Sequence, residues 1–273
     1  MALDGAGFNI VIRAVATLLP HEQTIPEHVD KMVREIEREG VQKDPVVIDE
    51  DSGTVLDGMH RVAAFSRLGL ENAVCCSVDY SSAAVAVSRW ARVYTSIDRG
   101  ALMEAVGAAG ITRAAPLSHA LGELDARRAG LAAMISQKVF LPARQTSLAE
   151  AFSIVEGLDS ASQKNGWRRD FVPEDEVVDQ LKGAEKLVVM VQKLVKDDVL
   201  RAAGTRRLFP CKTSMHTIDP RPVGLGFPTS QLRGATTESL RGRVAASEGR
   251  LLPANSVYEG RRYKERLLVL GQA

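Results

Sequence analysis

The chain has 273 residues, of which 45% are hydrophobic and 25% are charged, and its 35 Lys and Arg residues against 34 Asp and Glu residues give a formal net charge of +1. This composition is that of a globular protein with one large domain or two modest ones. The near-neutral charge argues against a dedicated nucleic-acid binder, whose phosphate contacts require a basic excess.

Neither the apolar segments nor the cysteines direct the chain to a membrane or to an oxidising compartment. No run approaches the roughly 18 apolar residues that span a bilayer, and no small-residue cleavage site follows the apolar stretch from Phe8 to Leu19. Cys75 and Cys76 are adjacent, Cys211 is distant, and no C-x-x-C spacing is present. We therefore expect a cytoplasmic protein without a membrane partner, a disulfide framework or a structural zinc site.

The first 95 residues carry the sharpest signals of secondary structure. Apolar residues recur at helical spacing between Pro26, which is favourable in a first helical turn, and Gly40, which is typical of a helix end. This pattern predicts a helix over 26–39. The other elements expected here are strands over 8–12, 14–19, 45–48, 54–56 and 73–78, a turn over 49–53 and a short amphipathic helix from 59 to 69.

From residue 97 to about 205 the pattern changes to alanine-rich helical periodicity. We expect helices over 123–135 and 147–158 and one or two more within 174–195, where 187–191 fits either a strand or a buried helix. The segment from 208 onward is rich in Pro, Gly and Thr, and it predicts short strands over 213–218, 223–227 and 267–270.

The pair Asp57-Gly58, between a predicted strand and a predicted helix, has the composition of an anion-binding loop. The first N–H groups of a helix lack intrahelical partners, and Gly58 would let a phosphate approach them closely. His60 and Arg61 add donors, and a guanidinium can bind phosphate oxygens through two parallel hydrogen bonds. Asp57 could hold a magnesium ion against the phosphates. The simpler interpretation is that Asp57 caps the helix and that Asp-Gly forms an ordinary turn.

Four segments together resemble the ParB/sulfiredoxin-like fold: Leu19-Pro-His-Glu22, the helix from Pro26, Pro45-Val-Val-Ile48 and Val55-Leu-Asp-Gly-Met-His-Arg61. Within this fold they are most similar to the free-L-serine kinases, an archaeal ADP-dependent enzyme and its bacterial relative from siderophore pathways, and the resemblance returns over 208–218. It implies an α+β protein with a ParB/sulfiredoxin-like nucleotide-binding domain over 1–95. A helical middle section and a C-terminal α/β segment, which completes the active-site cleft, would form the substrate-side domain over 96–273.

The resemblance implies a kinase that transfers a phosphoryl group from ATP or ADP to the hydroxyl of free L-serine, giving O-phospho-L-serine for amino-acid or secondary-metabolite biosynthesis. It implies Glu22 as the general base, with Asp57 and His60 as further catalytic residues, and Mg²⁺ as a cofactor held by Asp57. The nucleotide would bind along the loop, at Asp57, Gly58, Met59, His60 and Arg61. The serine side would be formed by Trp90, Lys212, Thr213, Ser214 and His216. Met215 stands where relatives have an arginine, so that contact is lost or supplied elsewhere.

The residues alone leave plainer interpretations open at several of these positions. Glu22 is also typical of a solvent-exposed polar loop, and its neighbour His21 of a protein surface. Trp90 is more often a core residue, and His216 equally fits a hydrogen-bonded strand histidine.

The loop residues and the net charge also distinguish this chain from other proteins of the same fold class. A sulfiredoxin needs a cysteine in the loop, where this chain has Gly58-Met59-His60-Arg61. A ParB-like nucleotide-binding regulator of DNA is the main alternative, but the net charge of +1 and the lack of a clear recognition-helix pattern after residue 95 argue against nucleic acid as a partner. A kinase of another small hydroxy amino acid, such as L-threonine, is the second alternative. The sequence leaves the number of subunits open.

Overall fold

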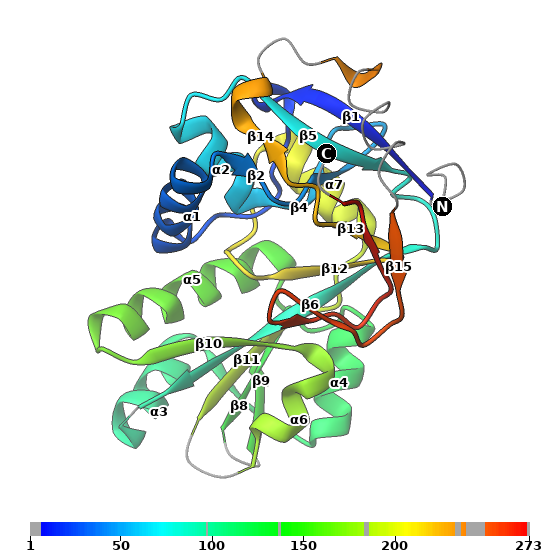
Figure 1. Ribbon diagram of the computed structural model, residues 1–273. Helices are drawn as coiled ribbons and strands as arrows, with labels where there is room; N and C mark the ends of the chain where they lie inside the picture. The colour runs from blue at the N-terminus through cyan, green and yellow to red at the C-terminus, as the bar shows by residue number, and fades with distance from the viewer. Residues whose placement is uncertain are drawn as a thin grey trace. The chain divides into compact units, whose positions relative to one another are not determined.

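The computed structural model of the protein describes residues 7–96, 98–135, 138–182, 186–232, 236–238 and 249–271. The chain divides into two compact units (Figure 1). Unit 1 contains residues 1–87, 196–211 and 216–273, and unit 2 contains residues 88–195 and 212–215. The C-terminal part of the chain therefore belongs with the N-terminal part, which differs from the expected division into 1–95 and 96–273.

Unit 1 begins with a small mixed sheet covered by two helices. Its elements are β1 (Phe8–Ala14), η1 (Val15–Thr17), α1 (Pro26–Glu39), β2 (Val41–Gln42), β3 (Val46–Asp49), β4 (Val55–Asp57), α2 (Met59–Arg67) and β5 (Asn72–Val78). The strands of the sheet follow the order β1-β5-β3-β4, with β3 and β5 parallel and the other pairs antiparallel. α1 and α2 lie side by side (Figure 1), and Val62 and Phe65 of α2 pack with Val46 and Ile48 of β3 in one buried apolar core.

The ends of two elements show how the sequence sets this local structure. The predicted helix over 26–39 is confirmed, because Pro26 lies in its first turn and Gly40 ends it in the left-handed conformation with φ 65°. The expected strand over 14–19 is wrong, because Val15 and Leu18 are both buried and a 3-10 turn places residues three apart on one side, which a strand does not. Leu19 returns to strand pairing through an isolated parallel bridge to Thr54.

The C-terminal segments of unit 1 are mostly short strands. They comprise α7 (Lys196–Thr205), β13 (Arg221–Val223), β14 (Phe227–Pro228), η3 (Thr229–Gln231), β15 (Arg250–Leu252), β16 (Val257–Tyr258), β17 (Arg261–Arg262) and β18 (Leu267–Val269). β14 pairs antiparallel with β2, and this pairing joins the end of the chain to its beginning. The strands β13, β18 and β15 form a three-stranded sheet, and β16 and β17 form a hairpin. The strand expected over 267–270 is confirmed, whereas the one expected over 223–227 is divided into β13 and β14 because Gly224 and Gly226 have positive φ between them.

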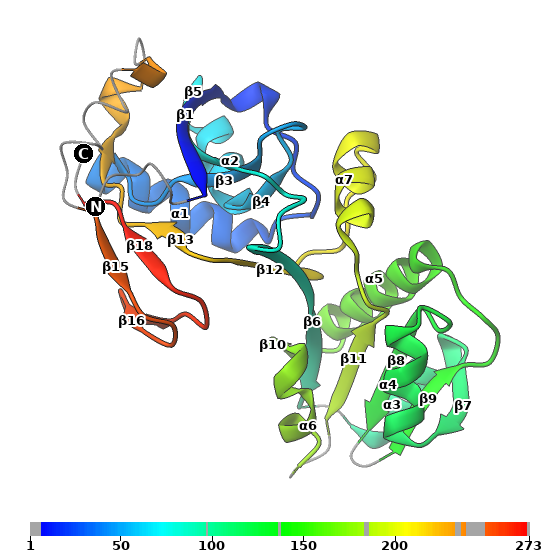
Figure 2. The same cartoon turned by 90° about the vertical axis from the view of Figure 1, so that its right-hand side faces the viewer.

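Unit 2 is built on a seven-stranded sheet with helices on both faces. Its elements are α3 (Arg99–Ala108), β7 (Ile111–Ala115), α4 (Leu117–Asp125), β8 (Leu131–Ile135), β9 (Lys138–Pro142), α5 (Leu148–Lys164), β10 (Arg168–Pro173), η2 (Glu174–Glu176), α6 (Val177–Gln180) and β11 (Leu187–Val191). The strands β6 (Val85–Thr95) and β12 (Ser214–Ile218) also belong to this sheet, and each has a few residues assigned to unit 1. The strand order is β10-β6-β11-β8-β9-β7, with β12 pairing to β6, and Figure 2 shows β6, β11 and β8 beside α5. One face packs against Leu102 of α3 and Val155 of α5, and the other against Leu124 of α4 and Val177 of α6.

The middle section is less helical than expected, because strands alternate with its helices. Residues 123–135 divide between the end of α4 and the strand β8, and residues 187–191 form the strand β11. Both strands are buried throughout, because helices cover both faces of the sheet, so their apolar residues do not alternate and the segments resemble buried helices in sequence. The helix expected over 147–158 is confirmed as α5, which begins with a reciprocal capping box between Ser147 and Glu150. Among the helices that the structure describes, none is long and apolar enough to cross a lipid bilayer.

Candidate active site

The loop between β4 and α2 has the backbone that the Asp57-Gly58 pair predicts. Gly58 precedes α2 with φ 101°, and a Cβ atom at this position would lie 2.8 Å from Nη2 of Arg61. The left-handed backbone therefore favours glycine here, and a Cβ atom would force the Arg61 guanidinium to shift from its present position. No side chain caps α2, so the interpretation of Asp57 as a simple helix cap is wrong.

The carboxylate of Asp57 is held by two arginines instead. Its Oδ2 lies 2.9 Å from Nη2 of Arg61 and 3.3 Å from Nη1 of Arg221, which comes from β13. Desolvation alone would raise the pKa of Asp57, but the guanidinium groups of Arg61 and Arg221 more than offset it and hold this pKa well below its usual range. Asp57 is therefore ionised at every physiological pH.

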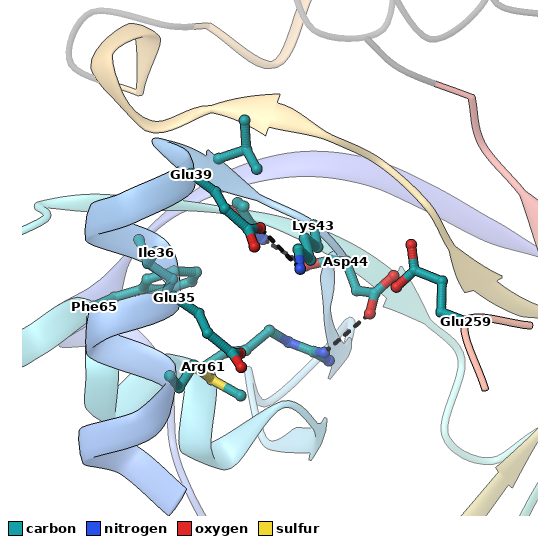
Figure 3. A pocket seen from close by; sticks show the side chains of 11 residues that line it. Glu35, Ile36, Glu39, Lys43, Asp44, Arg61, Phe65 and Glu259 are labelled. Atoms are coloured by element: carbon teal, nitrogen blue, oxygen red, sulfur yellow. Dashed lines mark hydrogen bonds and ion pairs between the residues drawn. The ribbon is translucent and has the colours of Figure 1, made fainter. Parts of the chain in front are cut away.

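Arg61 has a donor left over for a ligand. Its side chain is 17% exposed and reaches from α2 toward Asp44, with 3.6 Å between Nη1 and Oδ2 (Figure 3). Its Nε is buried and has no hydrogen-bond partner within the part of the chain that the structure describes. A buried donor without a partner is costly unless a ligand satisfies it. The guanidinium also lines a pocket of about 230 Å³ whose apolar wall includes Met32, Ile36 and Phe65.

The segment that carries Glu22 is buried and is hydrogen-bonded both to Val55 of β4 and to Phe209. The side chain of His21 is fully buried and that of Glu22 is nearly so, which shows that the expectation of a surface histidine and the alternative of a solvent-exposed glutamate are both wrong. Nδ1 of His21 donates to the carbonyl of Val55 at 2.7 Å. The amide of Phe209 donates to the carbonyl of His21 at 2.8 Å, and the amide of Gln23 donates to the carbonyl of Phe209 at 2.9 Å. These bonds hold Glu22 in a short parallel bridge with Phe209.

His60 links this segment to the loop. Its Nε2 accepts a hydrogen bond from the amide of Ile25, the residue before α1, at 3.0 Å. Nε2 is therefore an acceptor, and Nδ1 is the ring nitrogen that carries the proton in the neutral form. His60 and Met59, which begins α2, are both half-buried.

His216 lies deep in unit 1. Its Nε2 forms a hydrogen bond of 2.8 Å with the hydroxyl of Tyr80, its carbonyl accepts from Arg221, and its ring meets that of His21 edge to face with 5.3 Å between centroids. Desolvation lowers the pKa of His216 well below the ordinary value, and the nearby His21 and Arg221 lower it further. His216 is therefore neutral, and it has the hydrogen-bonded strand environment that the plainer interpretation described.

Four of the predicted serine-side residues meet within unit 2. The amide of Trp90 donates to the carbonyl of Thr213 at 3.0 Å, and Nζ of Lys212 lies 5.2 Å from the centroid of the Trp90 ring. This distance is that of a cation–π contact. Trp90 is half-buried, so the plainer interpretation of a core tryptophan is not met, and Thr213 and Ser214 are buried beside it.

Two residues that contact the loop, Asp44 and Arg221, carry no recognisable signal in the sequence, and neither does Tyr80, the partner of His216. Arg221 stands between two prolines in a segment without periodicity, and only the pairing of the C-terminal strands with the rest of unit 1 brings it to Asp57. Cys75 and Cys76 lie on the buried strand β5, and burial raises the pKa of Cys75 to about 12, so its thiol is not reactive. Among the residues described, no three His, Cys, Asp or Glu side chains gather into a metal-binding group.

Comparison with known proteins gives relatives of one kind over most of the chain. No protein-family model matches it. The ATP-dependent L-serine kinase of Desulfurococcus mucosus is 24% identical over 82% of this chain and 91% of the relative. The ADP-dependent L-serine kinase SerK of Thermococcus kodakarensis is 24% identical over 78% of this chain and 88% of the relative.

Two matches of higher identity are short. A ParB-like protein of Sulfolobus acidocaldarius is 37% identical over 28% of this chain. The chain covers 38% of the length of that ParB-like protein, and 33% of the length of an ATP-dependent L-serine kinase of Staphylothermus marinus to which it is 32% identical.

Solved structures share the fold of the chain. A free serine kinase in complex with AMP superposes with a TM-score of 0.69 at 20% identity, over 82% of this chain and 93% of that one. SbnI of Staphylococcus aureus, truncated at its C-terminus, superposes with a TM-score of 0.66 at 13% identity, over 86% of this chain and 94% of that one. The protein thus has the mixed α+β fold of these structures, and the resemblance to free-L-serine kinases that its motifs indicate is confirmed.

Proposed function

We propose that this protein is a free-L-serine kinase, which transfers a phosphoryl group from ATP or ADP to the hydroxyl of L-serine and releases O-phospho-L-serine. The similarity to archaeal L-serine kinases over most of the chain supports this proposal. The observation that carries it is local: the segment of Glu22 is hydrogen-bonded both to β4, which supplies Asp57, and through His60 to α2, which supplies Arg61. The buried carboxylate of Glu22 and the loop that would bind the phosphates are therefore parts of one hydrogen-bonded framework.

The nucleotide would bind at the loop. Its phosphates would meet the amides of the first turn of α2, which follow Gly58, and Nε of Arg61 would gain a hydrogen-bond partner. The pocket beside Arg61 offers an apolar wall to a nucleoside base and the Asp44 carboxylate to its hydroxyl groups (Figure 3). Asp57 would keep the guanidinium groups aligned, and Nδ1–H of His60 would be a further donor to the phosphates.

Glu22 would act as the general base. An alcohol is a weak nucleophile at neutral pH, and a carboxylate within hydrogen-bond reach removes its proton as the O–P bond forms. The β,γ bond of ATP, or the α,β bond of ADP, breaks in the same transfer, and the proton of the serine hydroxyl passes to Glu22. The near-complete burial of Glu22 suits this role, because bulk water would compete with the serine hydroxyl for the base.

Asp57 would also hold Mg²⁺, which when bound supplies positive charge against the phosphate oxygens. Both of its ion pairs use Oδ2, so Oδ1 is the oxygen that we assign to the metal. One or two carboxylates together with substrate phosphates are a usual coordination set for this ion, so the loop does not need a cluster of acidic residues.

The serine would be recognised by residues of β6 and of the segment 212–216. Lys212 would attract the carboxylate of the amino acid, and the Trp90 face beneath it would form a flat wall that favours a short side chain. The polar side chains of Thr213 and Ser214, with His216, would complete the set on the returning segment. The product carries a leaving group on its β-carbon, which suits an intermediate of amino-acid or secondary-metabolite biosynthesis in the cytoplasm.

The test is incubation of the protein with Mg-ATP or Mg-ADP and, in separate samples, L-serine, L-threonine or L-homoserine, followed by ³¹P NMR. A phosphomonoester resonance of O-phospho-L-serine with one donor is the expected result. Phosphorylation of L-threonine in place of L-serine would assign the other hydroxy amino acid, and the absence of a phosphorylated amino acid in all samples would contradict a kinase. Glu22→Gln serves as the matched inactive control.

A ParB-like nucleotide-binding regulator of DNA is the second candidate, favoured by the short match to the ParB-like protein of Sulfolobus acidocaldarius. It predicts retention on duplex DNA with a steep dependence on salt concentration. We expect no such retention, because the net charge is only +1.

A further inference from the structure

We propose that His21 is a positioning residue for Glu22, and that its imidazole fixes the base relative to the strand that supplies Asp57. The inference rests on the proposed function, since it assigns a role in delivering the general base. The ring of His21 meets the Val55 carbonyl and the rings of Phe209 and His216, and Glu22 is its neighbour in the chain. Its effect on the reaction would therefore pass through Glu22.

The backbone before His21 pairs in parallel with the start of β4, but this pairing stops after one bridge, between Leu19 and Thr54. The amide of Leu19 donates to the carbonyl of Gly53 at 3.1 Å, and the amide of Val55 donates to the carbonyl of Leu19 at 2.9 Å. In a regular parallel pair the next amide, two residues on, would bind the Val55 carbonyl. That carbonyl accepts instead from Nδ1 of His21, at 2.7 Å. The His21 side chain thus replaces one backbone hydrogen bond of the parallel pairing.

This replacement frees the backbone of the segment to turn the other way. The carbonyl of His21 accepts a hydrogen bond from the amide of Phe209, and the amide of Gln23 donates to the carbonyl of Phe209. Glu22 therefore lies between two backbone hydrogen bonds to Phe209. The imidazole is a second link to β4, two residues after the backbone bond between Leu19 and Val55, and Val55 lies two residues before Asp57. Removal of the imidazole would leave Glu22 held at Phe209 and Leu19 held at Val55, but it would remove the hydrogen bond to β4 from the residue next to Glu22.

The surroundings of the imidazole suit a role in geometry. Its Nε2 lies 3.8 Å from Oε1 of Glu22, beyond hydrogen-bond distance, and its ring packs edge to face against Phe209 and His216. Because a carbonyl only accepts, the proton must be on Nδ1. Desolvation lowers the pKa of His21, and Glu22 and the Val55 carbonyl oppose this only in part, so the ring that holds the base is neutral.

The experiment compares His21→Asn with His21→Leu. The two side chains have nearly the same shape, and the amide of Asn can donate from the position of Nδ1 whereas Leu has no donor. His21→Leu should lower kcat by about 100-fold, as expected for a reacting group displaced by about 1 Å, and His21→Asn should recover most of that loss. His119→Asn, at an exposed histidine of α4, is the control and should leave kcat unchanged.

A double-mutant cycle with Glu22→Gln separates positioning from general stabilisation. If His21 acts through Glu22, adding His21→Leu to Glu22→Gln should lower kcat by less than about threefold, because neighbouring groups that act together are not additive. A loss in the Glu22→Gln background as large as that in the wild type would overturn the proposal, and so would a His21→Asn variant as slow as His21→Leu. The latter result would point to proton transfer by the imidazole.

A second readout does not depend on kinase activity. Crystal structures of the wild type and of both His21 variants give the distance from the Glu22 carboxylate to the Asp57 carboxylate. The distance should be kept in His21→Asn and changed in His21→Leu. An unchanged distance in His21→Leu would overturn the positioning role even if wild-type protein phosphorylated no amino acid, whereas inactivity of the wild type by itself would count only against the proposed function.

Discussion

Arg221 of β13 and Asp57 of β4 face each other, with 3.3 Å between Nη1 and Oδ2, so a residue from the C-terminal part of the chain stabilises the carboxylate that precedes Gly58. Arg221 also pairs with Glu265 and donates to the carbonyl of His216. The loop therefore has two cations in place before any ligand binds, Arg61 from its own helix and Arg221 from the C-terminal segment.

Arg221→Gln should destabilise the protein. It leaves the carboxylates of Asp57 and Glu265 without their common partner, and we expect a loss of about 3 kcal/mol in the free energy of unfolding, at the lower end for a broken buried pair because Asp57 stays partly exposed. Urea unfolding measures the change. Arg266→Gln, which removes an exposed pair with Asp219, is the matched control and should leave the midpoint nearly unchanged. Equal midpoints for both variants would show that the Arg221 pair adds no stability.

The ion pair of Asp57 should give a defined pH dependence. Its pKa is lowered in the folded state, so the unfolded chain binds the proton more tightly, and the stability that Asp57 contributes is present above its unfolded pKa of about 3.9. This contribution is lost as the pH falls through the folded pKa. The difference in free energy of unfolding between the wild type and Asp57→Asn should therefore be constant between about pH 5 and 8 and shrink below about pH 4. A difference that is the same at about pH 3 and about pH 7 would contradict the pairing.

Gly58→Ala should impair nucleotide binding. The left-handed backbone strains any residue with a Cβ, and this Cβ would also collide with Arg61. Gly40→Ala is the control, because Gly40 also has positive φ but no atom within 4 Å of its would-be Cβ. Both variants should lose about 1–3 kcal/mol of stability, by the cost of backbone strain, but only Gly58→Ala should weaken ADP binding in calorimetry. Equal affinities would place the phosphates elsewhere.

Arg61→Ala should weaken nucleotide binding about 10- to 100-fold, which is the range for the loss of a hydrogen bond to a charged group. Arg67→Ala, at an exposed arginine further along α2, should leave the affinity unchanged. If both substitutions have the same effect, the contribution is one of overall charge and not of the Arg61 donors.

Glu22→Gln should lower kcat by about 10²–10⁴-fold, the usual contribution of a general base. The affinity for nucleotide should stay within about threefold, because the amide keeps the size of the side chain and the loop is untouched. Steady-state kinetics gives kcat, and calorimetry gives the affinity for the nucleotide. Near-normal turnover would assign the base to another residue.

The sequence was informative where local chemistry decides the structure. Pro26 and Gly40 predict where α1 begins and ends. The pair Asp57-Gly58 predicts the end of a strand, a residue in the left-handed conformation and the start of a helix, and each of these signals comes from residues adjacent in the sequence. The sequence was misleading where tertiary packing decides. The strands Leu131–Ile135 and Leu187–Val191 are buried on both faces, and an apolar run without alternation does not distinguish a strand from a helix.

The residues of the candidate site also differ in whether local sequence could identify them. The members of the loop could be named from the sequence because they are contiguous. Arg221 could not, because its partner Asp57 lies on a strand from the other end of the chain. His21 was expected at the surface, and its burial rests on contacts with residues distant in the sequence, such as the bond to the Val55 carbonyl, which no local pattern signals.

The measurement that tests the central claim most directly is ¹³C NMR of L-serine labelled at its β-carbon, incubated with the wild type and with Glu22→Gln in the presence of magnesium and ATP or ADP. The kinase predicts a downfield shift of the labelled carbon with splitting by phosphorus in the wild-type sample and a far slower change in the variant. A labelled carbon that stays unshifted with both donors, while the nucleotide binds at the loop, would contradict it.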